Sequence, residues 1–172
     1  TGWVGYTLSW SDRRFDELNN GRRFFYKYDR RHDLNIVLMK RFGSKIEASG
    51  TWVFGTGNAV TIPVGIYSVD HPLGINTNQP AYYSSQLLQY EYGERNAYRM
   101  NPYHRLDLSI SFIKQRKWGE SRWVVSIYNA YNRKNPFYID VAKNTAPEGI
   151  TYKYMQYSLF PIIPSISYHF KF

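Results

Sequence analysis

The last residues of the chain alternate strictly between apolar and polar side chains. One face of this segment carries the apolar set of Ile162, Pro164, Ile166, Tyr168, Phe170 and Phe172. The other face carries the polar set of Ser165, Ser167, His169 and Lys171. Because successive side chains of a β-strand point to opposite faces, the pattern predicts a strand whose apolar face meets either a protein core or lipid. Several such strands are needed to choose between the two environments.

The composition favours strands over helices if the chain is in a membrane. Of the 172 residues, 43% are hydrophobic and 20% are charged, which is within the range of globular domains. Aromatic residues are unusually frequent at 19%, yet no apolar run approaches the ~20 residues that a membrane helix needs. Rings with one apolar and one polar end gather where a β-barrel meets water on either side of a membrane.

The charge and the missing cysteines exclude some kinds of site without identifying a partner. A net charge of +9 is compatible with nucleic acid, with acidic glycolipid or with solubility alone. With no cysteine, the chain has neither disulfide bonds nor thiolate-bound metals. It begins Thr1-Gly2-Trp3, in strand-like sequence and without an initiator methionine, so we expect a mature piece or a fragment of a longer protein.

Period-two patterning recurs in six segments. They are residues 3–11, 32–42, 46–54, 104–112, 122–131 and 160–172, and the last of them can extend back to Lys153. Tight turns at 43–45 and 116–120 alternate with long links at 12–31, 55–103 and 132–152. This alternation predicts a meander with short turns at one end and long loops at the other, and it puts Phe172 at the short-turn end, as in outer-membrane barrels.

Strand and loop lengths favour lipid over a soluble core. About ten residues at ~3.3 Å rise and ~40° tilt span the ~25 Å lipid-facing band of a barrel. A soluble sandwich also gives alternation, but it does not predict a connection as long as 57–103. Six strands alone would leave two open edges in lipid, so other strands must complete the barrel. We therefore predict an all-β fold, a segment of a transmembrane, antiparallel, up-and-down β-barrel.

Six short motifs resemble, in order, the C-terminal end of TonB-dependent outer-membrane receptors. They occupy residues 3–10, 28–34, 52–58, 103–108, 128–136 and 164–172, so the resemblance extends over nearly the whole length of the chain. The resemblance implies a barrel of ~22 strands closed by an N-terminal plug domain, in which this chain supplies the last six strands. It also implies uptake of a scarce nutrient across the outer membrane of a Gram-negative bacterium, energised from the inner membrane through TonB.

The same resemblance implies a set of partners. They are the rest of the barrel and the plug, the TonB complex through the upstream part of the protein, outer-membrane lipid and lipopolysaccharide, and a surface lipoprotein as a further candidate. The final strand resembles the signal that the barrel assembly machinery reads. The matching positions are Ile166, Tyr168, Phe170 and Phe172.

The polar strand faces are predicted to line the lumen. This set contains Asp33, Asn35, Arg41, Glu47, Arg105, Asp107 and Lys171. The set mixes both signs of charge, and a plugged barrel must satisfy polar groups on both surfaces, so we expect some of these residues to contact the plug. Polarity of the wall alone is the alternative.

Two of the long links are rich in aromatic residues. Arg22 and Arg23 precede Tyr26 in a run that interleaves cations with rings, a composition also typical of platforms for single-stranded nucleic acid. No recognisable nucleic-acid-binding fold surrounds this run, and in a barrel its arginines would pair with lipopolysaccharide phosphates while its rings line the substrate vestibule. Tyrosines of the second link are either ligand contacts or a rigid aromatic lid. They include Tyr82, Tyr83, Tyr90 and Tyr92.

No enzymatic site is expected. His32 adjoins Asp33, but neighbours in a strand point to opposite faces and cannot form an acid–base pair. The other histidines, at 71, 104 and 169, are scattered, so we expect no metal site and no cofactor. Two rival functions stay open: a passive or adhesive barrel that acts through its loops, and a soluble basic β-domain that binds nucleic acid.

Overall fold

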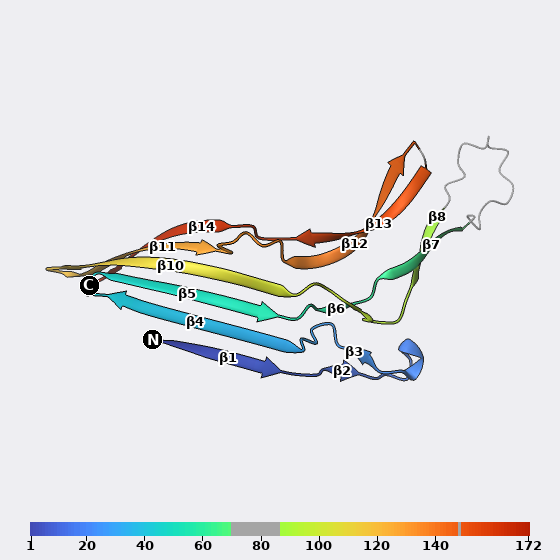
Figure 1. Cartoon of the computed structure of the whole chain (residues 1–172), viewed down its shortest axis with the longest axis horizontal. Coiled ribbons are helices and arrows are strands. Elements are labelled where there is room, and N and C mark those ends of the chain that lie inside the picture. The colour runs from blue at the N-terminus through green and yellow to red at the C-terminus, as the bar shows by residue number, and fades with distance from the viewer. Residues whose placement is uncertain (70–86, 148) are drawn as a thin grey trace.

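One six-stranded antiparallel sheet dominates the computed structural model, which describes residues 1–69, 87–147 and 149–172 (Figure 1). In spatial order its strands are β1 (Gly2–Leu8), β4 (His32–Phe42), β5 (Ile46–Gly55), β10 (Tyr103–Arg116), β11 (Gly119–Tyr128) and β14 (Ile163–Lys171). Spatial neighbours are also successive long strands of the sheet along the chain, as a meander requires. All six predicted strands are confirmed, with ends that shift by a few residues.

The two short turns lie at the same end of the sheet, where β14 also ends (Figure 1). Residues 43–45 join β4 to β5, and φ of +66° at Gly43 is a left-handed conformation that favours glycine. Only Lys117 and Trp118 form the tip between β10 and β11, a tighter turn than expected. We call this end of the sheet the short-turn end, and the opposite end the loop end.

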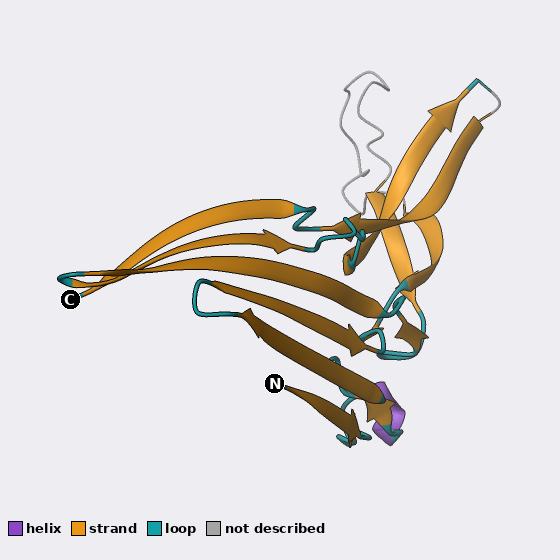
Figure 2. Ribbon diagram, turned by 60° about the vertical axis from the view of Figure 1, so that its left-hand side comes forward, coloured by secondary structure: helices purple, strands orange, loops and turns teal. Residues whose placement is uncertain are grey.

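The long links contain strands of their own, which the sequence patterns did not predict. Two hairpins project beyond the loop end (Figures 1 and 2). They are β7 (Pro63–Val69) with β8 (Leu87–Tyr92), and β12 (Pro136–Ala146) with β13 (Gly149–Ser158). The shorter elements are β2 (Asp12–Arg13) with β3 (Phe24–Phe25), β6 (Ala59–Val60) with β9 (Tyr98–Arg99), and the 3-10 turn η1 (Asn19–Gly21). Because Lys153 belongs to β13, the last strand does not extend back to it.

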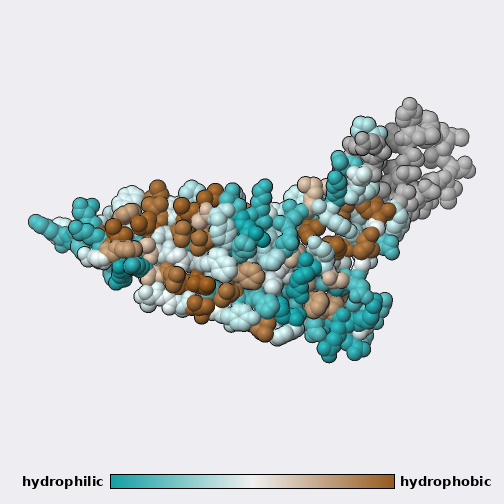
Figure 3. All heavy atoms as spheres, in the orientation of Figure 1, coloured by the Kyte–Doolittle hydropathy of each residue, from teal (hydrophilic) through white to brown (hydrophobic). Residues whose placement is uncertain are grey.

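One face of the six-stranded sheet is apolar, and the strand register aligns its side chains in rows across the strands. The middle row contains Leu38, Gly50, Leu108, Ile127 and Pro164. An aromatic row crosses near the short-turn end, with Phe42, Ile46, Phe112, Trp123 and Tyr168. A second ring-rich row crosses near the loop end, with Tyr6, Leu34, Phe54 and His104. Figure 3 shows hydrophobic residues gathered over the sheet between hydrophilic ends.

The opposite face of the sheet is polar and internally hydrogen-bonded. The hydroxyl groups of Ser49 and Ser109 lie 2.9 Å apart, and those of Ser126 and Ser165 lie 2.7 Å apart. Near the short-turn end, Arg41 Nε donates to Glu47 Oε2 at 2.7 Å. The predicted division of the strands into an apolar and a polar face is confirmed.

The apolar face has no covering layer in the part of the chain that the structure describes. Within that part the buried hydrophobic residues are Phe24, Ala59 and Met100, all at the loop end. By contrast Leu38 is 62% exposed and Ile166 is 69% exposed on the apolar face. No described helix is long and apolar enough to cross a membrane.

The sheet is open at both sides. Strands β1 and β14 form its edges, and among the described residues neither has a neighbouring strand on its outer side. The all-β antiparallel class is therefore confirmed, as an open sheet rather than a closed barrel.

Candidate functional site

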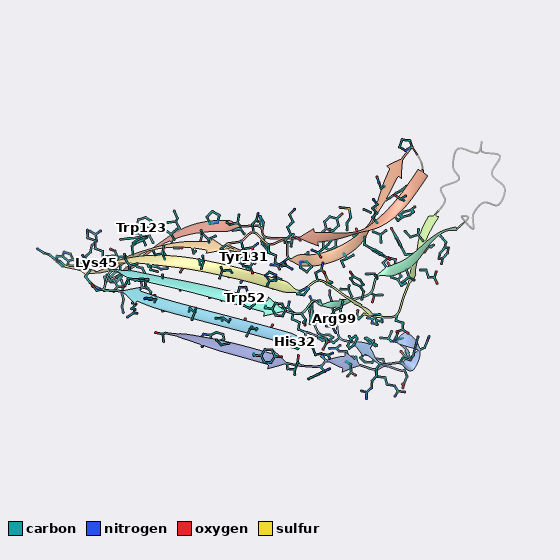
Figure 4. All side chains as sticks on the ribbon, in the orientation of Figure 1. His32, Lys45, Trp52, Arg99, Trp123 and Tyr131 are labelled. Atoms are coloured by element: carbon teal, nitrogen blue, oxygen red, sulfur yellow. The ribbon has the colours of Figure 1, made fainter. Side chains whose placement is uncertain are left out.

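A buried carboxylate joins the first two long links at the loop end. Asp29 is 1% exposed, and its carboxylate accepts hydrogen bonds from Arg99 Nη2 at 2.5 Å and from the backbone N–H of Ser11 at 2.6 Å. Arg99 also donates to the carbonyl oxygens of Asp29 and Gly57. A second guanidinium, that of Arg31, lies 3.8 Å from the same carboxylate. Figure 4 shows Arg99 among the short loop-end strands.

The surroundings of Asp29 keep its carboxylate ionised. Burial by itself raises the pKa of this carboxyl group, but the hydrogen bonds from Arg99 and Ser11 lower it. The positive charges of Arg99 and Arg31 act in the same direction, and the pKa of Asp29 is below its usual 3.8. The pair therefore holds the segment before β4 against β9 at neutral pH.

A cleft of about 330 Å³ lies between the same two links. Its lining residues are Asp12, Asn19, Arg23, Phe24, Phe25, Glu94, Arg95 and Ala97. Arg23 pairs with Asp12 at 3.2 Å, and Arg22 reaches Glu94 at 2.6 Å. Of the two predicted arginines, Arg23 lines the cleft, and Arg22 pairs with Glu94, which also lines it.

The predicted loop tyrosines do not join this cleft. Tyr26 lies under the Arg13 guanidinium, 3.9 Å from the ring centroid. Tyr90 and Tyr92 lie on β8 with ring centroids 6.4 Å apart, and both are exposed. Tyr82 and Tyr83 lie outside the described residues. The described candidates for ligand contact are therefore separated: the arginines belong to the cleft, Tyr90 and Tyr92 to a hairpin, and Tyr26 to neither.

A second cleft, of about 260 Å³, separates the two projecting hairpins. It is lined by Val64 and Ile66 of β7 and by Tyr152 and Tyr154 of β13, and the Tyr154 hydroxyl donates to the carbonyl oxygen of Pro63. Neither tyrosine was among the predicted ligand contacts, because the sequence patterns did not predict strand β13.

Asparagine side chains fix the start of the third long link, and none of them was predicted. Asn129 is 1% exposed, donates through Nδ2 to the carbonyl oxygens of Arg133 and Phe160, and accepts from the N–H of Arg133. Asn135 donates to the carbonyl oxygen of His104 and accepts from its N–H. The signal that could have found them is the run of asparagines in motif 128–136.

The predicted lumen residues divide into two clusters on the polar face. Near the loop end, Asn35 donates to Asp33 at 2.6 Å, and Arg105 Nε donates to Asp107 at 2.9 Å. Arg105 also donates to the hydroxyl groups of Tyr103 and Tyr128, at 2.9 and 2.6 Å. These side chains are half-buried and form a polar surface on this face of the sheet.

The second cluster lies near the short-turn end. Glu47 pairs with Arg41 at 2.7 Å and with Arg122 at 3.7 Å, and Arg122 also reaches Glu120 at 3.4 Å. Lys171 lies on the same face, opposite Glu120 in the register. The two carboxylates of this cluster, Glu47 and Glu120, are paired with arginines of the sheet.

The predicted assembly-signal residues share one face at the end of the chain. Ile166, Tyr168 and Phe170 lie on β14, and Phe172 follows it; all four are exposed. The Tyr168 ring packs against Trp123 with centroids 4.8 Å apart.

Two histidines of the sheet, His32 and His104, have structural partners. His32 Nδ1 lies 2.8 Å from the Tyr6 hydroxyl, whereas its neighbour Asp33 contacts Asn35. His104 Nδ1 lies 2.7 Å from the Tyr131 hydroxyl. These pairs stand near the loop end, where Figure 4 shows His32, Trp52 and Tyr131. In residues 1–69, 87–147 and 149–172, no group of three or more acidic or histidine side chains could hold a metal ion.

The described residues therefore form three surfaces: an apolar sheet face, a polar sheet face and a docked group of loops. No family model matches the chain, and no significant match was found among curated proteins or solved structures.

Proposed function

We propose that this chain forms part of the wall and the extracellular loops of an outer-membrane β-barrel. The observation that carries the proposal is the exposed apolar face, on which mostly aliphatic side chains lie between two ring-rich rows, while side chains of the other face hydrogen-bond to one another. A soluble sheet of this size would bury such a face under a second layer. A hydrocarbon layer over this face would also explain the two ring-rich rows, because aromatic side chains gather where a barrel wall meets the membrane interfaces.

The spacing of the two ring-rich rows fits a bilayer. From His104 to Phe112 strand β10 rises about 27 Å at ~3.4 Å per residue. A tilt of ~40° reduces this to about 21 Å along the membrane normal, against the ~25 Å band typical of barrels. The aromatic rings would then lie at the two interfaces.

Within this frame we propose a TonB-dependent receptor that takes up a nutrient without covalent chemistry. The motif resemblance and the alternation of short turns with long, mutually docked loops support it. The polar cluster at Asp33, Asn35, Arg105 and Asp107 would contact the plug. The clefts and the exposed Tyr90 and Tyr92 would face the external ligand.

Single-cysteine labelling tests the membrane position directly, because the chain has no cysteine of its own. Two variants of the intact protein are made, Leu108→Cys and the adjacent Ser109→Cys. Each cysteine is labelled with an environment-sensitive fluorophore, and the protein is reconstituted in phosphatidylcholine vesicles. Quenching by lipids labelled in the acyl chain is expected at position 108 and not at 109. Equal quenching at both positions, or none at either, would exclude a lipid-covered face.

Crosslinking in cells separates the receptor from a passive or adhesive barrel. The intact receptor is expected to crosslink to TonB, and ligand uptake is expected to stop when the proton-motive force is dissipated. Uptake that continues without TonB would leave a passive barrel as the function.

A further inference from the structure

A lysine lies on the apolar face, where a charge is unexpected. In β4 the apolar face reads Leu34, Ile36, Leu38, Lys40 and Phe42. Lys40 is exposed and aligned with Ala48, one row inside the aromatic row of the short-turn end. Its Nζ lies over the Phe42 ring, 5.1 Å from the centroid, so the side chain reaches toward the short-turn end. Among the described residues no carboxylate lies within 4 Å of it.

The short-turn end is also the most basic part of the sheet. Residues 39–48, 113–122 and 169–172 carry eight lysines and arginines against two glutamates, a net +6 of the chain's +9. The two carboxylates, those of Glu47 and Glu120, form ion pairs with Arg41 and Arg122. Within the described part, the remaining cations have no carboxylate partner. They are Lys40, Lys45, Lys114, Arg116, Lys117 and Lys171.

Lys40 lines a groove of about 1080 Å³, and one side of this groove is formed by Thr1, Gly2, Trp3 and Val4 at the edge of the sheet. Small residues, Gly50 and Ala48, line it, and Leu38 and Leu108 bound it. The row that holds Gly50 runs through the middle of the apolar band, and the row of Lys40 and Ala48 is the next toward the short-turn end. The groove therefore leads from the centre of the apolar face to a cation at its margin.

We propose that this groove and Lys40 bind one anionic glycerophospholipid from the leaflet at the short-turn end. The inference rests on the membrane position proposed above. The acyl chain lies over Gly50 and Ala48, and the phosphate contacts Lys40, with Lys45 of the adjoining turn near the headgroup. A lysine is a compact charge that suits a phosphate, and long cationic side chains at the margin of the hydrocarbon extend toward headgroups. Figure 4 shows Lys45 at this end.

Native mass spectrometry of the intact protein tests the site with two lipids of identical acyl chains, phosphatidylglycerol and phosphatidylcholine. Wild-type protein is expected to retain the first phosphatidylglycerol more tightly than phosphatidylcholine. Lys40→Gln is expected to weaken phosphatidylglycerol binding about fivefold, the equivalent of ~1 kcal/mol for one cation at a membrane surface. Ala48→Leu fills the groove and is expected to weaken retention of both lipids.

Lys27→Gln is the matched control. Lys27 is also exposed and lies over a neighbouring ring, 5.6 Å from the Tyr28 centroid, but at the loop end. This variant is expected to bind phosphatidylglycerol as the wild type does. Equal affinity of wild type for both lipids, or equal loss in Lys27→Gln and Lys40→Gln, would overturn the site.

Flotation separates failure of this site from failure of the proposed function. If the wild-type protein floats with phosphatidylcholine vesicles after an alkaline wash, but Lys40→Gln binds phosphatidylglycerol normally, only the lipid site is wrong. If the protein does not float, the proposed membrane position is wrong, and the lipid site that depends on it is wrong as well.

Discussion

Replacing Leu108 by arginine tests the assigned environment of the sheet at its most sensitive point. Leu108 lies in the middle row of the apolar face, equally far along β10 from His104 and from Phe112, and it is 44% exposed. At the midplane of a bilayer an arginine on the lipid face costs ~2–4 kcal/mol of folding free energy, and at the interface ~0–1 kcal/mol. We therefore expect a large cost for Leu108→Arg and a small one for Phe112→Arg.

Ser109→Arg is the control on the opposite face of the same strand. It removes the hydroxyl contact with Ser49, at 2.9 Å, which contributes ~1 kcal/mol in a typical case. The new guanidinium meets a polar face, so no further desolvation cost is expected. We therefore expect Leu108→Arg to be the most destabilising variant, with Ser109→Arg and Phe112→Arg both costing less.

The measurement is urea unfolding of the intact protein in lipid vesicles, followed by tryptophan fluorescence. Trp123 is a suitable probe because it is 52% exposed on the apolar face. If Phe112→Arg cost as much as Leu108→Arg, the dependence on depth would be absent and a protein layer would cover the face. If Ser109→Arg cost as much as Leu108→Arg, the assignment of the two faces would be wrong.

Three further variants test the loop end. Asp29→Asn removes the charge that faces Arg99 and Arg31, and should cost ~3 kcal/mol of loop docking, seen as faster proteolysis of 56–69 with little change in the sheet. Because the pKa of Asp29 is lowered, docking in the wild type should persist above pH 3.8 and weaken only as the pH falls below it, and early loss on acidification would contradict the ion pair. Asn129→Ala deletes three hydrogen bonds of a buried side chain and should speed amide exchange in residues 130–135, whereas exchange at wild-type rates would show that the link is held otherwise. Tyr92→Ala, at an exposed ring, should lower ligand uptake without changing stability, and normal uptake would remove β8 from the ligand surface.

Period two predicts the large sheet well because each of its strands separates two different environments. In 104–112 every second residue is apolar, and the register confirms that these residues share a face with Trp52 and Ile127 of the neighbouring strands. The turn at 43–45 is equally local, since one glycine supplies the left-handed conformation. Neither inference needs information from distant parts of the chain.

The hairpins and the loop contacts could not be predicted in the same way. Strands β12 and β13 project from the sheet, and residues such as Asp140, Lys143 and Lys153 interrupt any apolar face. The link between Asp29 and Arg99 joins residues 70 positions apart, so no local pattern identifies it. The sequence also offered no means to predict that Arg22 and Arg23 lie apart from Tyr90 and Tyr92, because their separation depends on the tertiary structure.

The described sheet lacks both a cover for its apolar face and hydrogen-bond partners for its edge strands, and one partner cannot supply both. Its apolar face needs a medium that covers exposed side chains such as Leu38 and Ile166, and hydrocarbon does so without directional bonds. The outer edges of β1 and β14 carry backbone N–H and C=O groups that hydrocarbon cannot satisfy, at several kcal/mol for each unpaired group. Lipid on the face therefore makes the open edges costlier than water would. A membrane position for these strands requires further strands at both edges, and the proposed barrel meets both needs because closure removes the edges while the outer face stays in lipid.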